Sequence, residues 1–275
     1  MRFLDINPLP GRNARLTGYI HEDADQGQWN DSRPCVLILP GGGYQFLAPH
    51  EAEPVAMQFY VKGYQTFILY YSVSDLNTQE QTPLGLTPLC DASAAVQHIR
   101  ENSADWRVDA RKIAVLGFSA GGHLAASLGV FWNALELNKI WDTENGQNRP
   151  DALILCYPVI TAGKFSHRGS IDVLAGIEGD RSFYSLEKHV GRHTPPAFLW
   201  QTVDDAAVPV ENALLFISAL RKNGVPFECH LYDKGEHGIS LANGEAGRND
   251  PHCATWLNLC VEWLERQFGI YADRA

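Results

Sequence analysis

The stretch from Ala114 to Ala126 constrains the fold of this chain more than any other part of its sequence. It reads AVLGFSAGGHLAA, so an apolar run leads through a GFSAG turn into a helical pattern. A serine with glycine and alanine neighbours is typical of a tight strand-to-helix turn, because the backbone there crowds the adjacent strand and helix. We therefore expect Ser119 at the tip of such a turn, in a protein that combines strands with helices.

Apolar runs and amphipathic segments alternate along the chain. The apolar runs predict strands over residues 16–22, 35–39, 66–71, 113–117, 151–157, 197–202 and 226–232. The amphipathic segments predict helices over residues 50–62, 88–102, 120–132, 210–223 and 252–268. This alternation indicates an α/β fold with a mostly parallel central sheet and helices on both faces.

Residues 161–196 interrupt this alternation. The segment is rich in glycine, serine, histidine and charged residues, and it predicts one short helix near 182–190. We expect it to be a short lid or cap over the edge of the sheet, within a single domain of residues 1–275. The polar segments 23–34 and 72–87 are expected to be loops.

Chemically capable residues follow several of the predicted strands. They are Gly41–Gly43, Ser119, the pair Asp204 and Asp205, and His237. Because ligands bind at the carboxyl ends of parallel strands, these residues should gather at one edge of the sheet. A serine hydroxyl needs a neighbouring base, and the base needs an orienting acid. The sequence thus offers Ser119 as a candidate nucleophile, and His237 with Asp205 or Asp204 as candidates for its base and acid.

The chain resembles the α/β-hydrolase superfamily over nearly its full length. It looks most like the bacterial acetyl esterase and lipase-like branch, which is related to small carbohydrate esterases. The motifs that carry this resemblance are PGGGY at 40–44, GFSAGGH at 117–123, DDAAVP at 204–209 and GEHG at 235–238.

The resemblance implies a role for each motif. The family pattern D-x-x-V-P favours Asp205 over Asp204 as the acid that orients His237. The backbone N–H groups of Gly42, Gly43 and Ala120 are expected to form the oxyanion hole. Relatives often carry a histidine before the three glycines, and Pro40 stands there in this chain.

Three further residues are candidates for contact with substrate. Tyr44 and Phe118 flank the two key turns, and Glu51 follows the glycine loop. Aromatic side chains of this kind are also common core residues, and a carboxylate at a helix start can instead interact with the helix dipole.

The resemblance implies a serine carboxylic-ester hydrolase that works through an acyl-enzyme. Its expected substrates are small soluble short-chain esters, above all acetyl esters, including acetylated sugars or xylo-oligosaccharides. One alternative is an amide or peptide hydrolase similar to arylformamidases or prolyl oligopeptidases. Another is a hydrolase-fold binding protein without catalysis.

Composition narrows the partners. The net charge of −10 and the pI of about 5.4 argue against nucleic acids and anionic membranes as partners. We expect no signal peptide and no membrane span, because the N-terminus has no apolar core segment and no apolar run reaches membrane length. The six scattered cysteines favour reduced thiols and a cytoplasmic location. The histidines show no metal-binding spacing, so we expect no metal and no cofactor. A homodimer is a further expectation.

Overall fold

The computed structural model describes residues 1–9, 11, 13–22, 32–74, 82–139, 143–244 and 248–270. Within these residues, an 8-stranded sheet has the order β1-β2-β4-β3-β5-β6-β7-β8. The strands are β1 (Arg2–Ile6), β2 (Arg15–Ile20), β3 (Arg33–Leu39), β4 (Gln65–Tyr70), β5 (Val108–Phe118), β6 (Ala152–Cys156), β7 (Ala197–Thr202) and β8 (Phe227–Tyr232). The antiparallel pairs are β1 with β2 and β2 with β4, whereas all other neighbours are parallel.

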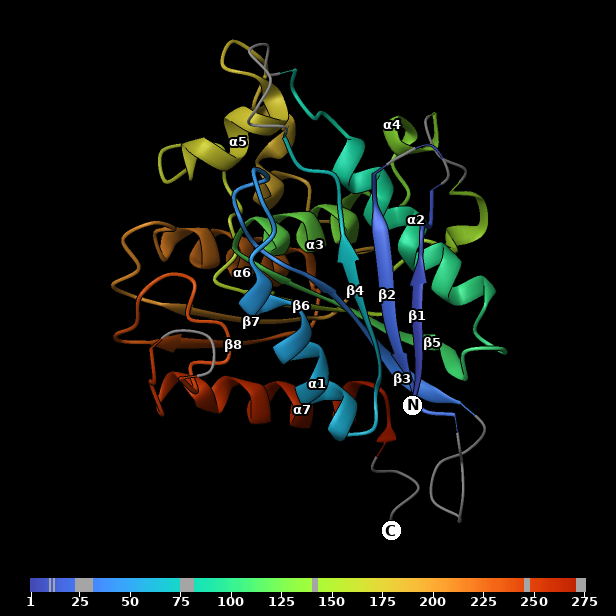
Figure 1. The fold of residues 1–275 in the computed structure, drawn as a ribbon. Coiled ribbons are helices and arrows are strands. Elements are labelled where there is room, and N and C mark those ends of the chain that lie inside the picture. Colours follow the sequence, from blue (N-terminus) through green and yellow to red (C-terminus); the bar gives the residue numbers. More distant parts are fainter. Residues whose placement is uncertain are drawn as a thin grey trace.

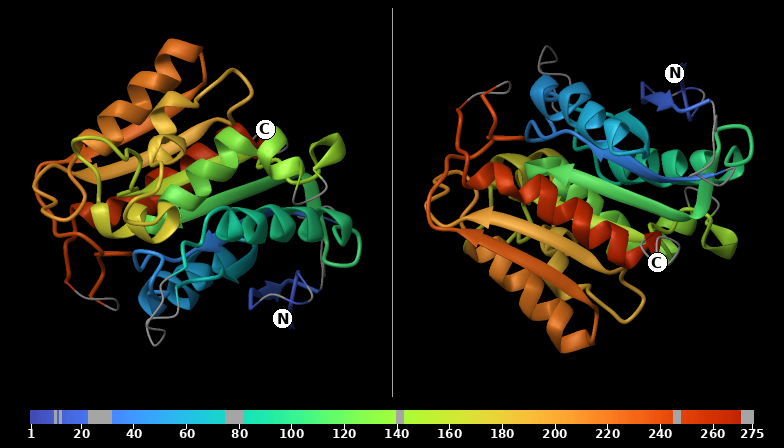
Figure 2. Two further views of the ribbon diagram at one scale, coloured as in Figure 1. Left: turned by 90° about the horizontal axis from the view of Figure 1, so that it is seen from above. Right: turned by 90° about the horizontal axis from the view of Figure 1, so that it is seen from below.

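The helices cover both faces of this sheet, as the sequence predicts. They are α1 (Glu53–Val61), α2 (Thr87–Glu101), α3 (Ser119–Phe131), α4 (Leu135–Asn138), α5 (Arg168–Ala175), α6 (Glu211–Asn223) and α7 (Trp256–Gln267). In Figure 1, α7 lies below β7 and β8, while α3 and α6 lie above them. Figure 2 shows α2 and α3 side by side. No helix of the described residues is long and apolar enough to cross a membrane.

Strand β3 shows why the sheet is buried on both faces. Val36 and Ile38 pack into the core that α1 and α7 complete. Leu37 and Leu39 point the other way, into the core formed with α2, α3 and α6. Because successive side chains alternate between faces, a strand covered on both sides reads as a continuous apolar run. This explains why the run at 35–39 predicts the strand correctly.

Several elements differ from the sequence prediction, among them β1, the short helix α4 and the cap segment. Strand β1 was not predicted, because its residues alternate between half-buried and exposed and include the exposed Phe3. The short helix expected near 182–190 is wrong. The structure has two 3₁₀ turns there, η3 (Ser182–Tyr184) and η4 (Leu186–Lys188). The helix of this segment is instead α5 at its start, where Ile171 and Leu174 form a buried face.

The loop predictions at 23–34 and 72–87 lie partly outside the described residues, because the structure does not describe 23–31 and 75–81. The cysteines are all described, and all six are free thiols. Five of them are buried, and Cys229 is half-buried. Burial raises the pKa of the Cys35, Cys156 and Cys260 thiols well above the ordinary value, so these thiols stay protonated and unreactive.

Candidate active site

Ser119 occupies a strained turn between β5 and α3. Phe118 is still extended, whereas Ser119 has a φ of 51° and is the first residue of α3. A left-handed backbone at a non-glycine residue costs on the order of 1–3 kcal/mol, so the surroundings must hold it in place. A Cβ on Gly121 would lie 2.1 Å from the Leu39 carbonyl oxygen, so the glycine lets α3 start directly against β3. The turn therefore presents Ser119 at the carboxyl edge of the sheet.

Ser119, His237 and Asp205 form one hydrogen-bonded chain. The distance from Ser119 Oγ to His237 Nε2 is 2.8 Å. The distance from His237 Nδ1 to Asp205 Oδ2 is 2.7 Å. Since an ionised carboxylate can only accept, Nδ1 carries the ring proton and Nε2 is left to accept from the serine hydroxyl.

The two adjacent aspartates have different partners. Asp205 is buried, and its Oδ1 accepts the N–H groups of Ala207 and Val208, both at 2.9 Å. Asp204 is exposed, and its Oδ1 accepts the N–H of Gly235 at 2.8 Å. Of the two residues that the sequence left open, the structure thus places Asp205 against His237.

The glycine loop after β3 lies beside the serine. A Cβ on Gly41 would lie 3.1 Å from the Cβ of Ser119. Gly42 has a φ of 126°, and a Cβ there would lie 2.1 Å from the Phe46 carbonyl oxygen, so the loop requires glycine at this position. Gly41 donates its N–H to Glu51 Oε2 at 2.7 Å. Within the described ranges, no acceptor is bonded to the N–H of Gly42, Gly43 or Ala120, so these donors are available to a ligand.

Tyr44, Glu51 and Phe118, which were predicted as candidates for contact with substrate, are buried in the structure. Their side chains are 1%, 2% and 0% exposed, respectively. Phe118 packs in the core with Tyr157 and Trp256. Both carboxylate oxygens of Glu51 accept hydrogen bonds from the protein. All three side chains are held by contacts within the protein, and a contact with substrate stays a prediction.

Tyr44 and His123 connect the glycine loop to the cap segment. The Tyr44 hydroxyl lies 2.9 Å from His123 Nδ1, and His123 Nε2 lies 3.2 Å from the carbonyl oxygen of Tyr184. A carbonyl only accepts, so Nε2 carries the proton and Nδ1 accepts from Tyr44. Burial lowers the pKa of His123 to about 4, which keeps the ring neutral.

The cap segment contains His167, a histidine near His237 to which the sequence analysis assigned no role. His167 precedes α5, and its Nδ1 accepts from Ser170 Oγ at 2.8 Å and from Ser170 N at 3.3 Å. Burial and the nearby His237 lower the pKa of His167. No motif surrounds His167, so only its position in a predicted cap could have drawn attention to it.

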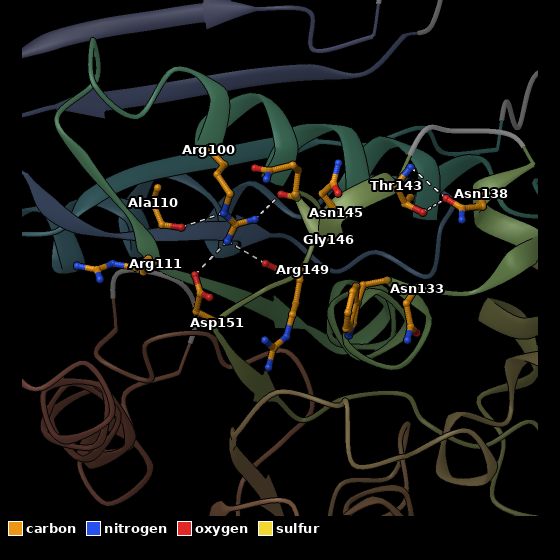
Figure 3. A pocket seen from close by; sticks show the side chains of 12 residues that line it. Arg100, Ala110, Arg111, Asn133, Asn138, Thr143, Asn145, Gly146, Arg149 and Asp151 are labelled. Carbon is orange, nitrogen blue, oxygen red and sulfur yellow. Dashed lines mark hydrogen bonds and ion pairs between the residues drawn. The ribbon is translucent and has the colours of Figure 1, made fainter.

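A hollow lies near the start of β5, at the end of that strand opposite to Ser119 (Figure 3). Its volume is about 830 Å³, and Arg100, Ala110, Trp132, Arg149 and Asp151 are among its lining residues. Arg100 donates to backbone carbonyls and to Asp151, so its guanidinium is already occupied. Because β5 begins near Ala110 and ends beside Ser119, this hollow is remote from the serine. Across the described residues, no group of three or more His, Cys, Asp or Glu side chains could hold a metal ion.

The fold and the serine–histidine–aspartate chain at the carboxyl edge of its sheet define an α/β-hydrolase. Residues 25–172 match the model of the BD-FAE family, and the chain belongs to this family. Residues 175–270 match the model of the prolyl oligopeptidase family. The family resemblance inferred from the motifs is therefore confirmed.

Two of the relatives are a xylanase and an acetylxylan esterase. The chain is 40% identical over 233 residues to endo-1,4-beta-xylanase B of Butyrivibrio fibrisolvens. The aligned region covers 84% of this chain and 35% of that protein. It is 29% identical to an acetylxylan esterase of Xylanibacter ruminicola, over 77% of this chain and 42% of that protein. The chain thus spans well under half the length of these relatives.

A solved structure matches over the whole length. The acetyl ester-xyloside bifunctional hydrolase of Caldicellulosiruptor lactoaceticus is 36% identical, with a TM-score of 0.82 and 96% of both chains covered. This similarity supports the fold described above along nearly all of its elements.

Proposed function

We propose that this chain is a serine carboxylic-ester hydrolase that acts through an acyl-enzyme on short acyl groups. The observation that carries the proposal is the hydrogen-bonded chain Ser119–His237–Asp205, which lies beside the open N–H groups of the glycine loop. Such an arrangement combines an activated nucleophile with donors for a developing negative charge.

The geometry supports the following sequence of steps. Ser119 Oγ attacks the ester carbonyl carbon while His237 Nε2 takes the hydroxyl proton, and Asp205 stabilises the resulting imidazolium. The carbonyl oxygen becomes an oxyanion that accepts from Gly42, Gly43 and Ala120. His237 then returns the proton to the departing alcohol. A water molecule, deprotonated by His237, then attacks the acyl carbon. The bond between the acyl carbon and Ser119 Oγ breaks, His237 returns the proton to Oγ, and the acid leaves.

Two observations support acetyl esters of sugars or xylo-oligosaccharides as substrates. The relatives named above include an acetylxylan esterase and an acetyl ester-xyloside hydrolase. Ser119 is 7% exposed, which favours a small acyl group. Phe46, which is 58% exposed beside Gly42, offers an apolar surface at the rim.

Amide or peptide hydrolysis is the second candidate, because residues 175–270 match the prolyl oligopeptidase family model. The arylformamidase-like alternative belongs to the same test. A binding protein without catalysis is disfavoured by the complete hydrogen-bonded chain. The cytoplasmic location and the homodimer stay predictions.

A fluorophosphonate probe and p-nitrophenyl acetate test the proposal together. The wild type should be labelled and should hydrolyse the ester. Ser119→Ala should not be labelled, and its kcat should be lower by a factor on the order of 10⁶. Ser127→Ala, in the same helix and also buried, is the matched control and should be labelled like the wild type. A wild type that is neither labelled nor active would exclude the enzyme proposal.

The substrate class is tested with the same protein. We expect kcat/KM to fall as the acyl chain of p-nitrophenyl esters lengthens, and acetylated xylo-oligosaccharides to be deacetylated. Prolyl-p-nitroanilide peptides and N-formylkynurenine represent the amide alternative. A higher kcat/KM on either of these than on any ester would favour the amide hydrolase.

A further inference from the structure

Glu51 is a buried carboxylate that the proposed chemistry leaves unused. It ends the 3₁₀ turn η1 (Pro49–Glu51) and lies between the glycine loop and the end of β6. Among the ion pairs of the described residues, its single partner is His50, whose Nε2 lies 4.0 Å from Glu51 Oε1. Burial raises the pKa of Glu51 above its ordinary value, and hydrogen bonds from Tyr157 and Gly41 offset only part of this rise. A buried carboxylate of this kind persists only where donors replace the lost water.

The donor and the acceptor of each hydrogen bond around Glu51 can be assigned. Ser240 donates its N–H to the Tyr157 oxygen at 2.9 Å, so the Tyr157 hydroxyl is left to donate onward. It does so to Glu51 Oε1 at 2.6 Å, while Gly41 N–H donates to Oε2 at 2.7 Å. An ionised carboxylate accepts both bonds, whereas a proton on Oε1 would face the tyrosine proton. The arrangement therefore fits the charged form.

These bonds connect two loops of the site that are distant in sequence. Gly41 directly precedes the two glycines with open N–H groups, and Ser240 follows His237 by three positions. Tyr157 also stands edge-on to the His237 ring, with centroids 5.0 Å apart. A further hydrogen bond joins the turn η1 to the His237 loop, because His50 Nε2 donates to the Gly238 carbonyl at 3.1 Å. One carboxylate thus contacts the glycine loop directly and reaches the loop of His237 through Tyr157.

We propose that ionised Glu51 is a positioning residue that holds the glycine loop and the His237 loop in register with Ser119. The bond to Gly41 orients the peptide that leads into Gly42. The bonds from Tyr157 to Glu51 and from Ser240 to Tyr157, here called the Tyr157 arm, fix the backbone that follows His237. Pro40 stands where relatives often carry a histidine, and Glu51 supports the loop from behind at this point. The inference rests on the proposed esterase function and adds a residue to it.

Three variants separate the two arms of Glu51. Glu51→Ala removes the acceptor of both Gly41 and Tyr157. Glu51→Gln keeps an acceptor for Gly41 and disturbs the Tyr157 arm, and Tyr157→Phe removes that arm alone. Displacing oxyanion donors or misplacing reacting groups costs on the order of 10²-fold in rate. We expect kcat on p-nitrophenyl acetate to fall by about that factor in Glu51→Ala and by about 10-fold in the other two.

The KM value and a transition-state analogue distinguish positioning from general damage to the fold. A trifluoromethyl ketone forms an oxyanion on Ser119, so its affinity should fall in parallel with kcat/KM, while KM for the ester stays close to the wild type. Glu53→Gln is the matched control. Glu53 lies two residues away on the exposed side of α1 and accepts from Tyr19, so its kcat should be unchanged.

Each outcome decides for or against the inference. Folded Glu51→Gln and Tyr157→Phe proteins with wild-type kcat and ketone affinity overturn it, even where Glu51→Ala fails to fold. A rise in KM at constant kcat overturns it as well. If the wild type hydrolyses no ester, the proposed function fails and this inference fails with it. An active wild type with insensitive variants refutes only the role of Glu51.

Discussion

Asp204 and Asp205 are neighbours in sequence, but their carboxylates have different partners. Asp205 Oδ2 contacts His237, and Asp204 Oδ1 contacts the backbone of Gly235. An asparagine at 205 can present an amide N–H to Nδ1, which stabilises the wrong ring tautomer. We therefore expect Asp205→Asn to lower kcat on the order of 10⁴-fold, as measured on p-nitrophenyl acetate.

Asp204→Asn serves as the matched variant for this prediction. Its amide oxygen can still accept from Gly235, so kcat should stay close to that of the wild type. The reverse ranking of the two variants would move the acid to Asp204. Circular dichroism and thermal melting of both proteins check that each is folded.

Sequence reasoning reached some residues of this site and missed others for a physical reason. Ser119 and His237 stand in local motifs after predicted strands, so their positions followed from the chain order. Glu51 was predicted only as a candidate for contact with substrate, and nothing in the sequence indicated its bonds to Gly41 and Tyr157. Its partner Tyr157 is 106 residues away, and its burial exists only after the two segments have packed together. The same holds for His167, whose proximity to His237 depends on where α5 lies.

At the level of elements, α3 offers a matched pair of glycines. A Cβ on Gly121 would meet the Leu39 carbonyl oxygen at 2.1 Å, and backbone cannot give way there. A Cβ on Gly129 would meet Cδ1 of Leu153 at 2.5 Å, and that side chain can rotate. We expect Gly121→Ala to lower the free energy of unfolding by about 2 kcal/mol or more and to reduce kcat, because α3 moves away from β3.

Gly129→Ala should behave differently on the same helix. Alanine favours the helix by about 1 kcal/mol over glycine, which offsets the rearrangement of Leu153. Urea unfolding of both variants at one pH measures the difference. Equal destabilisation would mean that the contact between α3 and β3 does not set the geometry of the turn.

Elements with a strong local pattern were predicted well, and elements that depend on their neighbours were not. Strand β7 has the predicted bounds, since AFLWQT is buried along its whole length. Helix α5 was missed because Gly169 and Ser170 weaken its local preference for a helix. Its stability comes from the buried Ile171 and Leu174 and from the cap formed by His167, which are tertiary features.

For the whole molecule, two buried ionisable groups give opposite contributions to acid stability. Burial raises the pKa of Glu51, so its protonation on acidification favours the folded state. Burial lowers the pKa of His123 from 6.5 to about 4, so the unfolded chain binds this proton first. Folded stability that depends on neutral His123 is therefore fully present above pH 6.5 and is lost as the pH falls toward 4.

The size of the His123 effect can be isolated with one substitution. The difference between the two pKa values corresponds to about 3 kcal/mol of unfolding free energy lost between pH 6.5 and 4. In His123→Gln, the amide can accept from Tyr44 and donate to the Tyr184 carbonyl, so the network remains while the titration disappears. Urea unfolding at several pH values should then show that the free energy of unfolding falls less steeply on acidification than in the wild type. The contribution of Glu51 is the same in both proteins and does not affect this difference.

The exposed His252→Gln controls for the loss of a histidine and should follow the wild type. Parallel declines in His123→Gln and the wild type would mean that the folded protein protonates His123 without disrupting the link between the glycine loop and the cap.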